Sequence, residues 1–201
     1  MIENKKEFIL ETASELFLKY GVRSLTMDDI ATGCGMSKKT IYMHFQNKTD
    51  LVNQFINSQS DNFKKRLMKV TNDSTNALDE LNSFLLLFKE IIKSFPPSLI
   101  RDINLTYDFS LLHYSHFKKE TLVPFTINNI KRGQDEKLYK EELELNAICE
   151  HFLNFISLFF TDENLIHNYD SLRMMEFYNS LLMYRITTEK GLNLLKFKRK
   201  L

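Results

Sequence analysis

Glycine and proline are scarce along this chain, and their positions leave room for long helices and little else. The 201 residues include 5 glycines and 3 prolines, and Gly21, Gly33 and Gly35 lie close together near the N-terminus. Apolar side chains recur at the spacing of one helix face, first between Ile9 and Tyr20. The sequence has no strand-like alternation of comparable length, internal repeat or low-complexity tract. It therefore predicts an all-α fold.

Composition indicates a reduced globular protein without an overall charge signature. Hydrophobic residues make up 43% of the sequence, enough for a sizeable core, and the formal net charge is +1. Contact with a polyanion would therefore need a local basic patch. Cys34 and Cys149 lie far apart, and the first residues do not resemble a signal peptide. The densest apolar stretch, 152–160, is shorter than the ~20 residues of a membrane span. We expect a cytoplasmic protein that does not enter membranes.

Helix-boundary signals are dense in the N-terminal part of the chain. A first helix is expected over about residues 5–20. Thr26 precedes Asp29 by three positions, the arrangement of a capping box at the start of a second helix. Ser37 and Asn47 are the corresponding N-cap residues of a third and a fourth helix.

The two predicted domains are residues 1–47, built from three short helices, and residues 48–201, a larger helical domain. The helices expected in the larger domain span roughly 48–70, 76–95, 98–117, 119–132, 142–161 and 170–189. Gly191 is among the residues expected to interrupt the helices. The basic stretch "KFKRK", residues 196–200, follows it and is expected to be a solvated tail.

The segment "IATGCGMSKKTI", residues 30–41, has the spacing of a helix-turn-helix. Ala31 is small enough to let two helices cross, and Gly35 can take the left-handed conformation of the turn. Ile41 would lock the second helix onto the first. Cys34 is expected to be a small buried side chain beneath the turn.

The second helix of this motif would present Lys38, Lys39 and Thr40 on its exposed N-terminal turn, the part of a recognition helix that reaches base edges. Lysine can donate to guanine, whereas threonine can donate, accept, or contact the thymine methyl group. Donors for phosphate oxygens follow at Tyr42, His44 and Lys48. The alternative for these side chains is an ordinary solvated or half-buried helix face.

A specific pattern runs without gaps through this region. It comprises Phe17 and Gly21, the "T-x-x-D-I-A" opening, the "G-x-S-x-x-T-x-Y-x-H-F" core from Gly35 to Phe45, and "N-K-x-x-L" from Asn47 to Leu51. In these positions the chain resembles the DNA-binding domain of the TetR family of bacterial transcriptional regulators. The resemblance extends over about residues 5–55.

The resemblance implies that Lys38, Lys39 and Thr40 face the bases. It also implies that the DNA backbone is held by Tyr42, His44 and Lys48, with Thr26 as a further phosphate contact. Many family members have a small residue in place of Lys39, so a base contact and a phosphate contact both stay open for this side chain. The predicted DNA-binding residues are Thr26, Ser37, Lys38, Lys39, Thr40, Tyr42, His44 and Lys48.

The larger domain is expected to dimerise and to hold a small hydrophobic or amphipathic effector. Two recognition helices about 34 Å apart would read a palindromic operator. The last two helices are apolar around much of their circumference, and by resemblance they form a four-helix bundle between protomers; intramolecular core is the alternative. The predicted pocket residues, which would equally suit a plain aromatic core, are Phe84, Phe88, Ile103, Tyr107, Leu111, Tyr114, Phe125 and Phe152.

These features predict a sequence-specific, ligand-responsive transcriptional regulator, and the family resemblance implies a repressor that its effector releases from the operator. The alternative is a helical lipid- or hydrophobe-binding protein without DNA function. No glycine-rich phosphate loop, nucleophile turn or paired carboxylates point to an enzyme. His113, His116 and Glu120 could share a helical face, but such a trio arises easily by chance, so no metal or cofactor is predicted.

Overall fold

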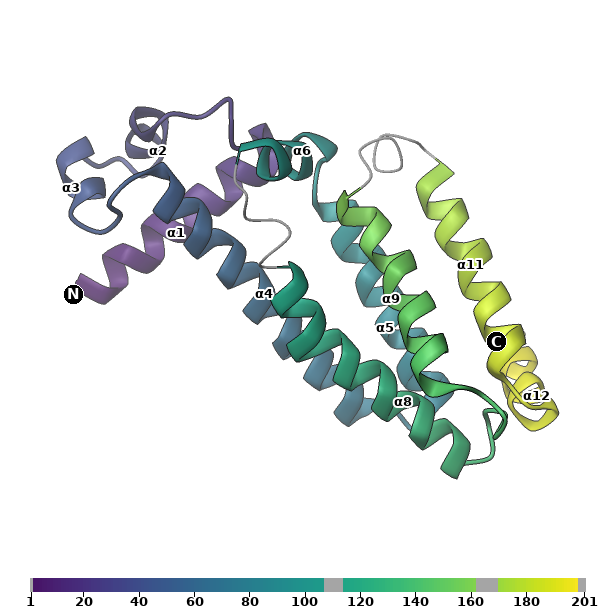
Figure 1. The fold of residues 1–201 in the computed structure, drawn as a ribbon. Helices are drawn as coiled ribbons and strands as arrows, with labels where there is room; N and C mark the ends of the chain where they lie inside the picture. Colours follow the sequence, from purple (N-terminus) through teal and green to yellow (C-terminus); the bar gives the residue numbers. More distant parts are fainter. Residues whose placement is uncertain (1, 107–113, 162–169, 199–201) are drawn as a thin grey trace. The chain divides into compact units, whose positions relative to one another are not determined.

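The computed structural model describes residues 2–106, 114–161 and 170–198, which are helical apart from short connections (Figure 1). Within these ranges the only strand-like pairing is an isolated antiparallel bridge between Tyr139 and Thr187. The all-α prediction is confirmed. None of the described helices is long and apolar enough to cross a membrane. The helices are α1 (Ile2–Tyr20), α2 (Met27–Gly33), α3 (Lys38–Tyr42), α4 (Lys48–Asp73), α5 (Ala77–Ser94), α6 (Pro97–Thr106), the π-helical turn η1 (Lys118–Leu122), α8 (Val123–Asp135), α9 (Leu145–Thr161), α11 (Asp170–Ile186) and α12 (Glu189–Lys198).

Two compact units divide the chain, and their boundary differs from the predicted one at residues 47 and 48. The first unit comprises Met1–Lys64 and Ile92–Leu112, and the second comprises Lys65–Ile91 and His113–Leu201. The N-terminal unit thus includes the first part of α4 and all of α6. Local helix signals could not predict this, because the grouping depends on which distant helices pack together.

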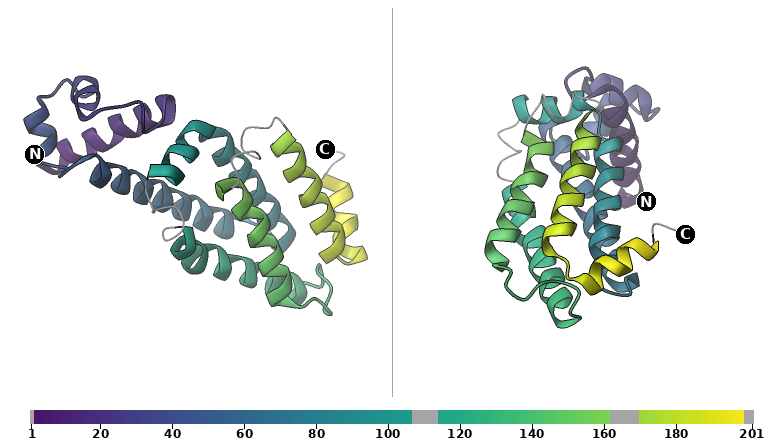
Figure 2. Two further views of the ribbon diagram at one scale, coloured as in Figure 1. Left: turned by 45° about the horizontal axis from the view of Figure 1, so that its top comes forward. Right: turned by 90° about the vertical axis from the view of Figure 1, so that its right-hand side faces the viewer.

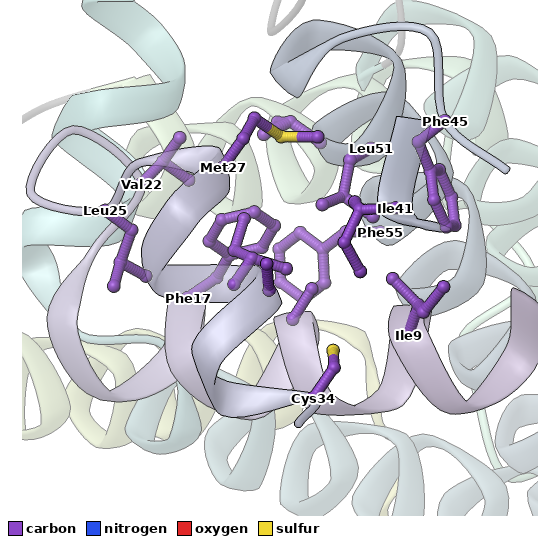
Figure 3. Close-up of a cluster of buried hydrophobic side chains, with 14 of the residues drawn as sticks. Ile9, Phe17, Val22, Leu25, Met27, Cys34, Ile41, Phe45, Leu51 and Phe55 are labelled. Atoms are coloured by element: carbon purple, nitrogen blue, oxygen red, sulfur yellow. The ribbon is translucent and has the colours of Figure 1, made fainter. Parts of the chain in front are cut away.

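The core of the N-terminal unit explains the apolar spacing of α1. Ile9, Phe17, Ile41 and Phe45 are fully buried, and the Phe17 ring meets the Phe55 ring edge-on with centroids 5.5 Å apart (Figure 3). Burying a side chain of this size typically stabilises a fold by about 1.5–3 kcal/mol. The recognition segment is therefore anchored through its apolar residues, which leaves its polar face outward.

Helix α6 joins this core through Leu99, which is fully buried, and through the partly buried Ile103, while the partly buried Phe95 lies in the connection before α6. The buried carboxylate of Asp102 accepts a hydrogen bond from the backbone N–H of Arg23 at 2.8 Å. The chain after α1 is therefore tied to α6 by one polar contact as well as by apolar packing.

The second unit surrounds a cluster of stacked phenylalanines. The Phe84 ring lies 4.8 Å from that of Phe125 and 5.8 Å from that of Phe152, centroid to centroid. Phe88 meets Phe159 edge-on at 5.7 Å. These side chains come from α5, α8 and α9, which run side by side in the views of Figure 2. Helix α11 packs along α9, where the Tyr178 and Phe155 rings stack at 3.7 Å.

A buried polar network closes the end of this unit. The Tyr139 hydroxyl lies 3.1 Å from both the Ala77 carbonyl and the Asn129 amide oxygen, and Asn129 donates to Glu80 at 2.8 Å. Burial raises the pKa of Tyr139 far above its ordinary value, with the nearby Glu80 and Glu136 charges as smaller causes. The turn after α8 is thus held against α5 by satisfied polar groups.

One predicted helix boundary was wrong. The chain is helical from residue 114 through Asp135, without the break expected near 118. Pro124, which has no N–H to donate to the preceding turn, lies two residues after the widened turn η1, so the helix passes the proline instead of ending. Helix α6 covers the first part of the helix expected over 98–117, and residues 107–113 lie outside the described ranges.

The expected solvated tail also begins as a helix. Gly191, read as a break, lies buried inside α12, where an added Cβ would stand 2.6 Å from the Leu138 carbonyl oxygen. The glycine therefore permits a close approach of two segments. This role depends on tertiary contact and leaves no local signal.

Candidate nucleic-acid interface

Helix α2 begins with a complete capping box. The Asp29 N–H donates to the Thr26 hydroxyl oxygen at 3.2 Å, and the Thr26 N–H donates to the Asp29 carboxylate at 2.7 Å. Hydrogen bonds from Thr26 lower the pKa of Asp29. The predicted cap is confirmed, and the Thr26 side chain is already engaged within the protein.

The turn between α2 and α3 has the predicted helix-turn-helix geometry. Gly35 has a φ of +63° with no atom within 4 Å of where its Cβ would lie, and the Met36 N–H donates to the Ala31 carbonyl at 2.9 Å. Cys34 is buried beneath this turn, and burial raises its pKa, so the thiol is a packing group.

Helix α3 is capped by Ser37, whose hydroxyl accepts from the Thr40 N–H at 3.1 Å. The two hydroxyl groups of Ser37 and Thr40 also lie 2.9 Å apart. Because Ile41 is fully buried in the core, the opposite face of this short helix points to solvent. The sequence-predicted cap of α3 is confirmed.

The exposed face of α3 and the turn after it hold most of the predicted DNA-binding side chains. Lys38, Lys39 and Tyr42 are exposed, and Thr40 and His44 are half-buried. Tyr42 keeps 44% of its surface accessible. The structure therefore brings these five residues to one short surface segment with a cationic and hydrogen-bonding character.

Lys38 has a partner that sequence reasoning missed. Its ammonium lies 2.9 Å from both carboxylate oxygens of Asp28, in the first turn of α2. The Asp28 carboxylate raises the pKa of Lys38 through this hydrogen bond and through its charge. Nothing in the sequence flagged Asp28, since its contact with α3 spans the turn.

Lys48, at the start of α4, differs from the other predicted contacts. It is half-buried, and its ammonium donates to the backbone carbonyl of Leu25. Burial lowers the pKa of Lys48, although the charges of Asp102 and Asp29 oppose this shift. The ammonium thus ties the chain before α2 to the start of α4 and faces inward.

The predicted effector-binding residues are divided by the structure. Phe84, Phe88, Phe125 and Phe152 form the buried ring cluster of the second unit, and the half-buried Tyr114 points its hydroxyl towards the Leu153 carbonyl at 3.4 Å. Ile103 instead packs against the core of the N-terminal unit. Tyr107 and Leu111 lie outside the described residues.

A groove of about 530 Å³ lies between α9 and α11 and involves none of the predicted effector-binding residues. Its lining includes apolar side chains, the carboxylates of Glu142 and Glu144, and the Arg185 guanidinium. Its lining is Glu142, Leu143, Glu144, Ala147, Ile148, His151, Tyr178, Leu181, Leu182, Arg185 and Ile186. These helices are the ones predicted to form the dimer interface.

Of the three residues considered for metal binding, two histidines and a glutamate, the structure describes two. His113 lies outside the described ranges, and His116 and Glu120 are exposed. Among residues 2–106, 114–161 and 170–198, no three His, Cys, Asp or Glu side chains are close enough to hold a metal ion.

Comparison with known proteins places this surface in a family. Residues 9–55, which include α2, the turn and α3, match the family of bacterial regulatory proteins called tetR. The segment 9–55 is thus a tetR-family domain. The match begins on α1 and ends on α4, so it contains α2, the turn and α3 but not α6, which adds Leu99 to the same core.

The relatives of this chain are distant in sequence. It is 26% identical over 92 residues to KstR2, an HTH-type transcriptional repressor of Mycobacterium tuberculosis, and this match covers about half of each protein, 46%. It is 26% identical over 155 residues to IcaR, a negative transcriptional regulator of the biofilm operon icaADBC in Staphylococcus aureus, which covers 77% of this chain and 79% of IcaR.

Solved structures share the fold of this chain beyond the helix-turn-helix. The ketosteroid transcriptional regulator KstR2 aligns with a TM-score of 0.61 and 18% identity over 92% of this chain and 95% of that one. AibR, solved in complex with isovaleryl coenzyme A and operator DNA, aligns with a TM-score of 0.57 and 21% identity over 77% and 85%.

Proposed function

We propose that this chain is a cytoplasmic, homodimeric transcriptional repressor that binds a palindromic operator through α3 and is released by a hydrophobic or amphipathic effector. The main support for the proposal is that the α3 segment has one buried apolar face and one exposed polar face. Ile41 and Phe45 are fully buried, while Lys38, Lys39 and Tyr42 point outward. A short helix held in this way can enter the major groove without disturbing its core.

Base readout is assigned to Lys38, Lys39 and Thr40, and phosphate contacts to Tyr42 and His44. Ser37 and Thr26, which are exposed although they cap their helices, lie at the edges of the segment. The Ser37 hydroxyl can supply a further donor, whereas the Thr26 hydroxyl already donates to the Asp29 carboxylate at 2.6 Å. Lys48 contributes mainly by holding Leu25, because at least one of its N–H groups is used there.

Dimerisation through α9 and α11 is supported by apolar side chains that these helices leave exposed. Leu158 on α9, with Phe177, Leu181 and Tyr184 on α11, remain accessible to solvent. The groove between the helices carries Glu142 and Arg185, so a two-fold-related copy would meet both signs of charge. A second copy would cover this surface and set two α3 helices at the spacing of successive major grooves.

The effector proposal rests on the aromatic interior of the second unit. Its phenylalanine cluster, with Tyr114 as a polar edge, suits an apolar or amphipathic molecule better than a sugar or nucleotide. KstR2 is a ketosteroid regulator, and AibR was solved with isovaleryl coenzyme A. Both names are consistent with an effector that carries a hydrophobic part.

The test is DNA binding by the purified protein, measured by fluorescence anisotropy on duplexes that it selects from a randomised library. We expect sequence-preferring, salt-sensitive binding, and a loss of about tenfold or more in the Lys38→Ala, Tyr42→Ala double variant. Lys19→Ala with Tyr20→Ala is the matched control, because Tyr20 is 50% exposed and this pair lies at the far end of α1 from α3. Binding without sequence preference, or equal losses in both double variants, would favour a hydrophobe-binding protein without DNA function.

A further inference from the structure

The ion pair between Asp28 and Lys38 joins the first turn of α2 to the first turn of α3. The ammonium is equidistant from the two carboxylate oxygens, at 2.9 Å each. Both side chains are exposed, with 64% of Asp28 and 52% of Lys38 accessible. One of the two exposed lysines of α3 is therefore already paired with a carboxylate of the same protein.

The Asp28 carboxylate is not needed to cap α2. Asp29 makes the capping box with Thr26, and the Asp28 backbone carbonyl accepts from Thr32. The negative charge of Asp28 interacts favourably with the positive N-terminal end of the α2 dipole, but a neutral residue at this position would leave the capping box intact. A negative charge at the edge of a DNA-facing surface repels phosphate, so this charge carries a cost for any DNA contact.

We propose that Asp28 is a specificity-determining residue that acts through Lys38 by weakening contacts to phosphate more than contacts to bases. This inference rests on the proposed function. In the free protein Asp28 also positions the Lys38 side chain, because the paired ammonium is held in front of α2 and does not sample the full range of a free lysine.

The discrimination follows from the chemistry of the two kinds of acceptor. An ammonium has three donors, so Lys38 can keep Asp28 and still donate to the neutral O6 or N7 of a guanine. A phosphate oxygen bears a charge and repels Asp28 at the same short distance. Random DNA offers chiefly phosphate to Lys38, whereas a selected operator offers a base edge. Asp28 therefore weakens non-specific binding more than operator binding.

The experiment compares wild type and Asp28→Asn on two duplexes of equal length, one selected by the wild-type protein and one of random sequence. Asparagine keeps the size of the side chain and removes its charge. We expect binding to the random duplex to tighten by roughly two- to fivefold, with a smaller change on the selected duplex. The slope of log K against log salt on random DNA should steepen by about one for each protomer, because Lys38 gains a phosphate contact.

Asp61→Asn is the matched control for the change in charge. Asp61 lies on α4 in the same unit, is 66% exposed and pairs with Lys64 at 3.7 Å. A second comparison repeats Asp28→Asn in a Lys38→Ala background. If Asp28 acts through Lys38, its effect on the ratio of the two affinities disappears there.

Each outcome decides the inference. A selected-to-random affinity ratio that falls in Asp28→Asn, but neither in Asp61→Asn nor in the Lys38→Ala background, supports it. An unchanged ratio, an equal fall in Asp61→Asn, or an effect that persists without Lys38 overturns it while the proposed function stands. A wild-type protein with no sequence preference overturns the proposed function, and the inference with it.

Discussion

The Arg23 N–H donates to the Asp102 carboxylate at 2.8 Å, which links the loop after α1 to α6 across 79 positions of the sequence. Only 5% of Asp102 is exposed. The same carboxylate stands 2.8 Å from the point where a Cβ on Gly21 would lie. One buried carboxylate thus fixes the conformation of the chain that leads into the helix-turn-helix.

Replacing this carboxylate should destabilise the N-terminal unit. Asp102→Ala leaves the Arg23 N–H without its acceptor, at a cost of about 1–3 kcal/mol. Asp102→Asn keeps an acceptor oxygen and should cost less. Thermal unfolding followed by circular dichroism measures both, with Glu11→Ala on the exposed face of α1 as the control. A melting temperature of Asp102→Ala equal to that of Glu11→Ala would contradict the assigned contact.

Alanine substitution should cost more stability at Gly21 than at Gly35, the two glycines of the N-terminal unit with a positive φ. Gly21 and Gly35 have φ values of +79° and +63°, so each change incurs a backbone cost of about 1–2 kcal/mol. Only the Cβ at Gly21 meets an obstacle, the Asp102 carboxylate, whereas that at Gly35 has no atom within 4 Å. We expect Gly21→Ala to lower the denaturation midpoint further. The excess should vanish when both changes are compared in an Asp102→Ala background.

Alkaline pH should weaken the second unit through Tyr114. Burial raises the pKa of this phenol to about 12 from its ordinary 10. The folded protein therefore holds the proton more tightly than the unfolded chain, so this contribution to stability is complete below pH 10 and is lost as the pH rises towards 12. Tyr114→Phe removes the ionisable group.

The difference in melting temperature between wild type and Tyr114→Phe, measured at pH 8 and at pH 11, tests this prediction. At pH 8 the wild type should be the more stable, because Tyr114→Phe removes the hydrogen bonds of the hydroxyl to Ser157 and to the Leu153 carbonyl. At pH 11 this advantage should shrink or reverse. Parallel losses in both proteins would show that Tyr114 does not titrate in this window.

A charge on the exposed face of α11 should prevent association of the protomers. Leu181 is 53% exposed and lines the groove between α9 and α11, and Leu86 on α5 is 55% exposed in the same unit. Leu181→Glu would place a carboxylate in the proposed interface and should yield monomers in sedimentation velocity. Leu86→Glu, its matched control, should remain dimeric. A dimeric Leu181→Glu variant together with a monomeric Leu86→Glu variant would indicate that the interface lies on α5.

Sequence reasoning succeeded where the signal is local. The caps at Thr26 and Ser37 and the left-handed turn at Gly35 were predicted correctly, because each depends on side chains within a few positions of its own backbone. It failed where a residue's role depends on a distant partner. Gly191 was read as a break and lies inside α12, and the hydrogen bond from Lys48 to the Leu25 carbonyl was not predicted.

By itself the sequence determined the helical class, the helix-turn-helix segment and the face of α3 that bears the lysines, since period, caps and turn residues act over short distances. Only the tertiary structure decided which segments share a core and which charges meet. Asp102 faces Arg23, Asp28 holds Lys38, and Ile103 joins the N-terminal unit. Each of these relationships arises from packing between separate helices, which one helix's pattern does not encode.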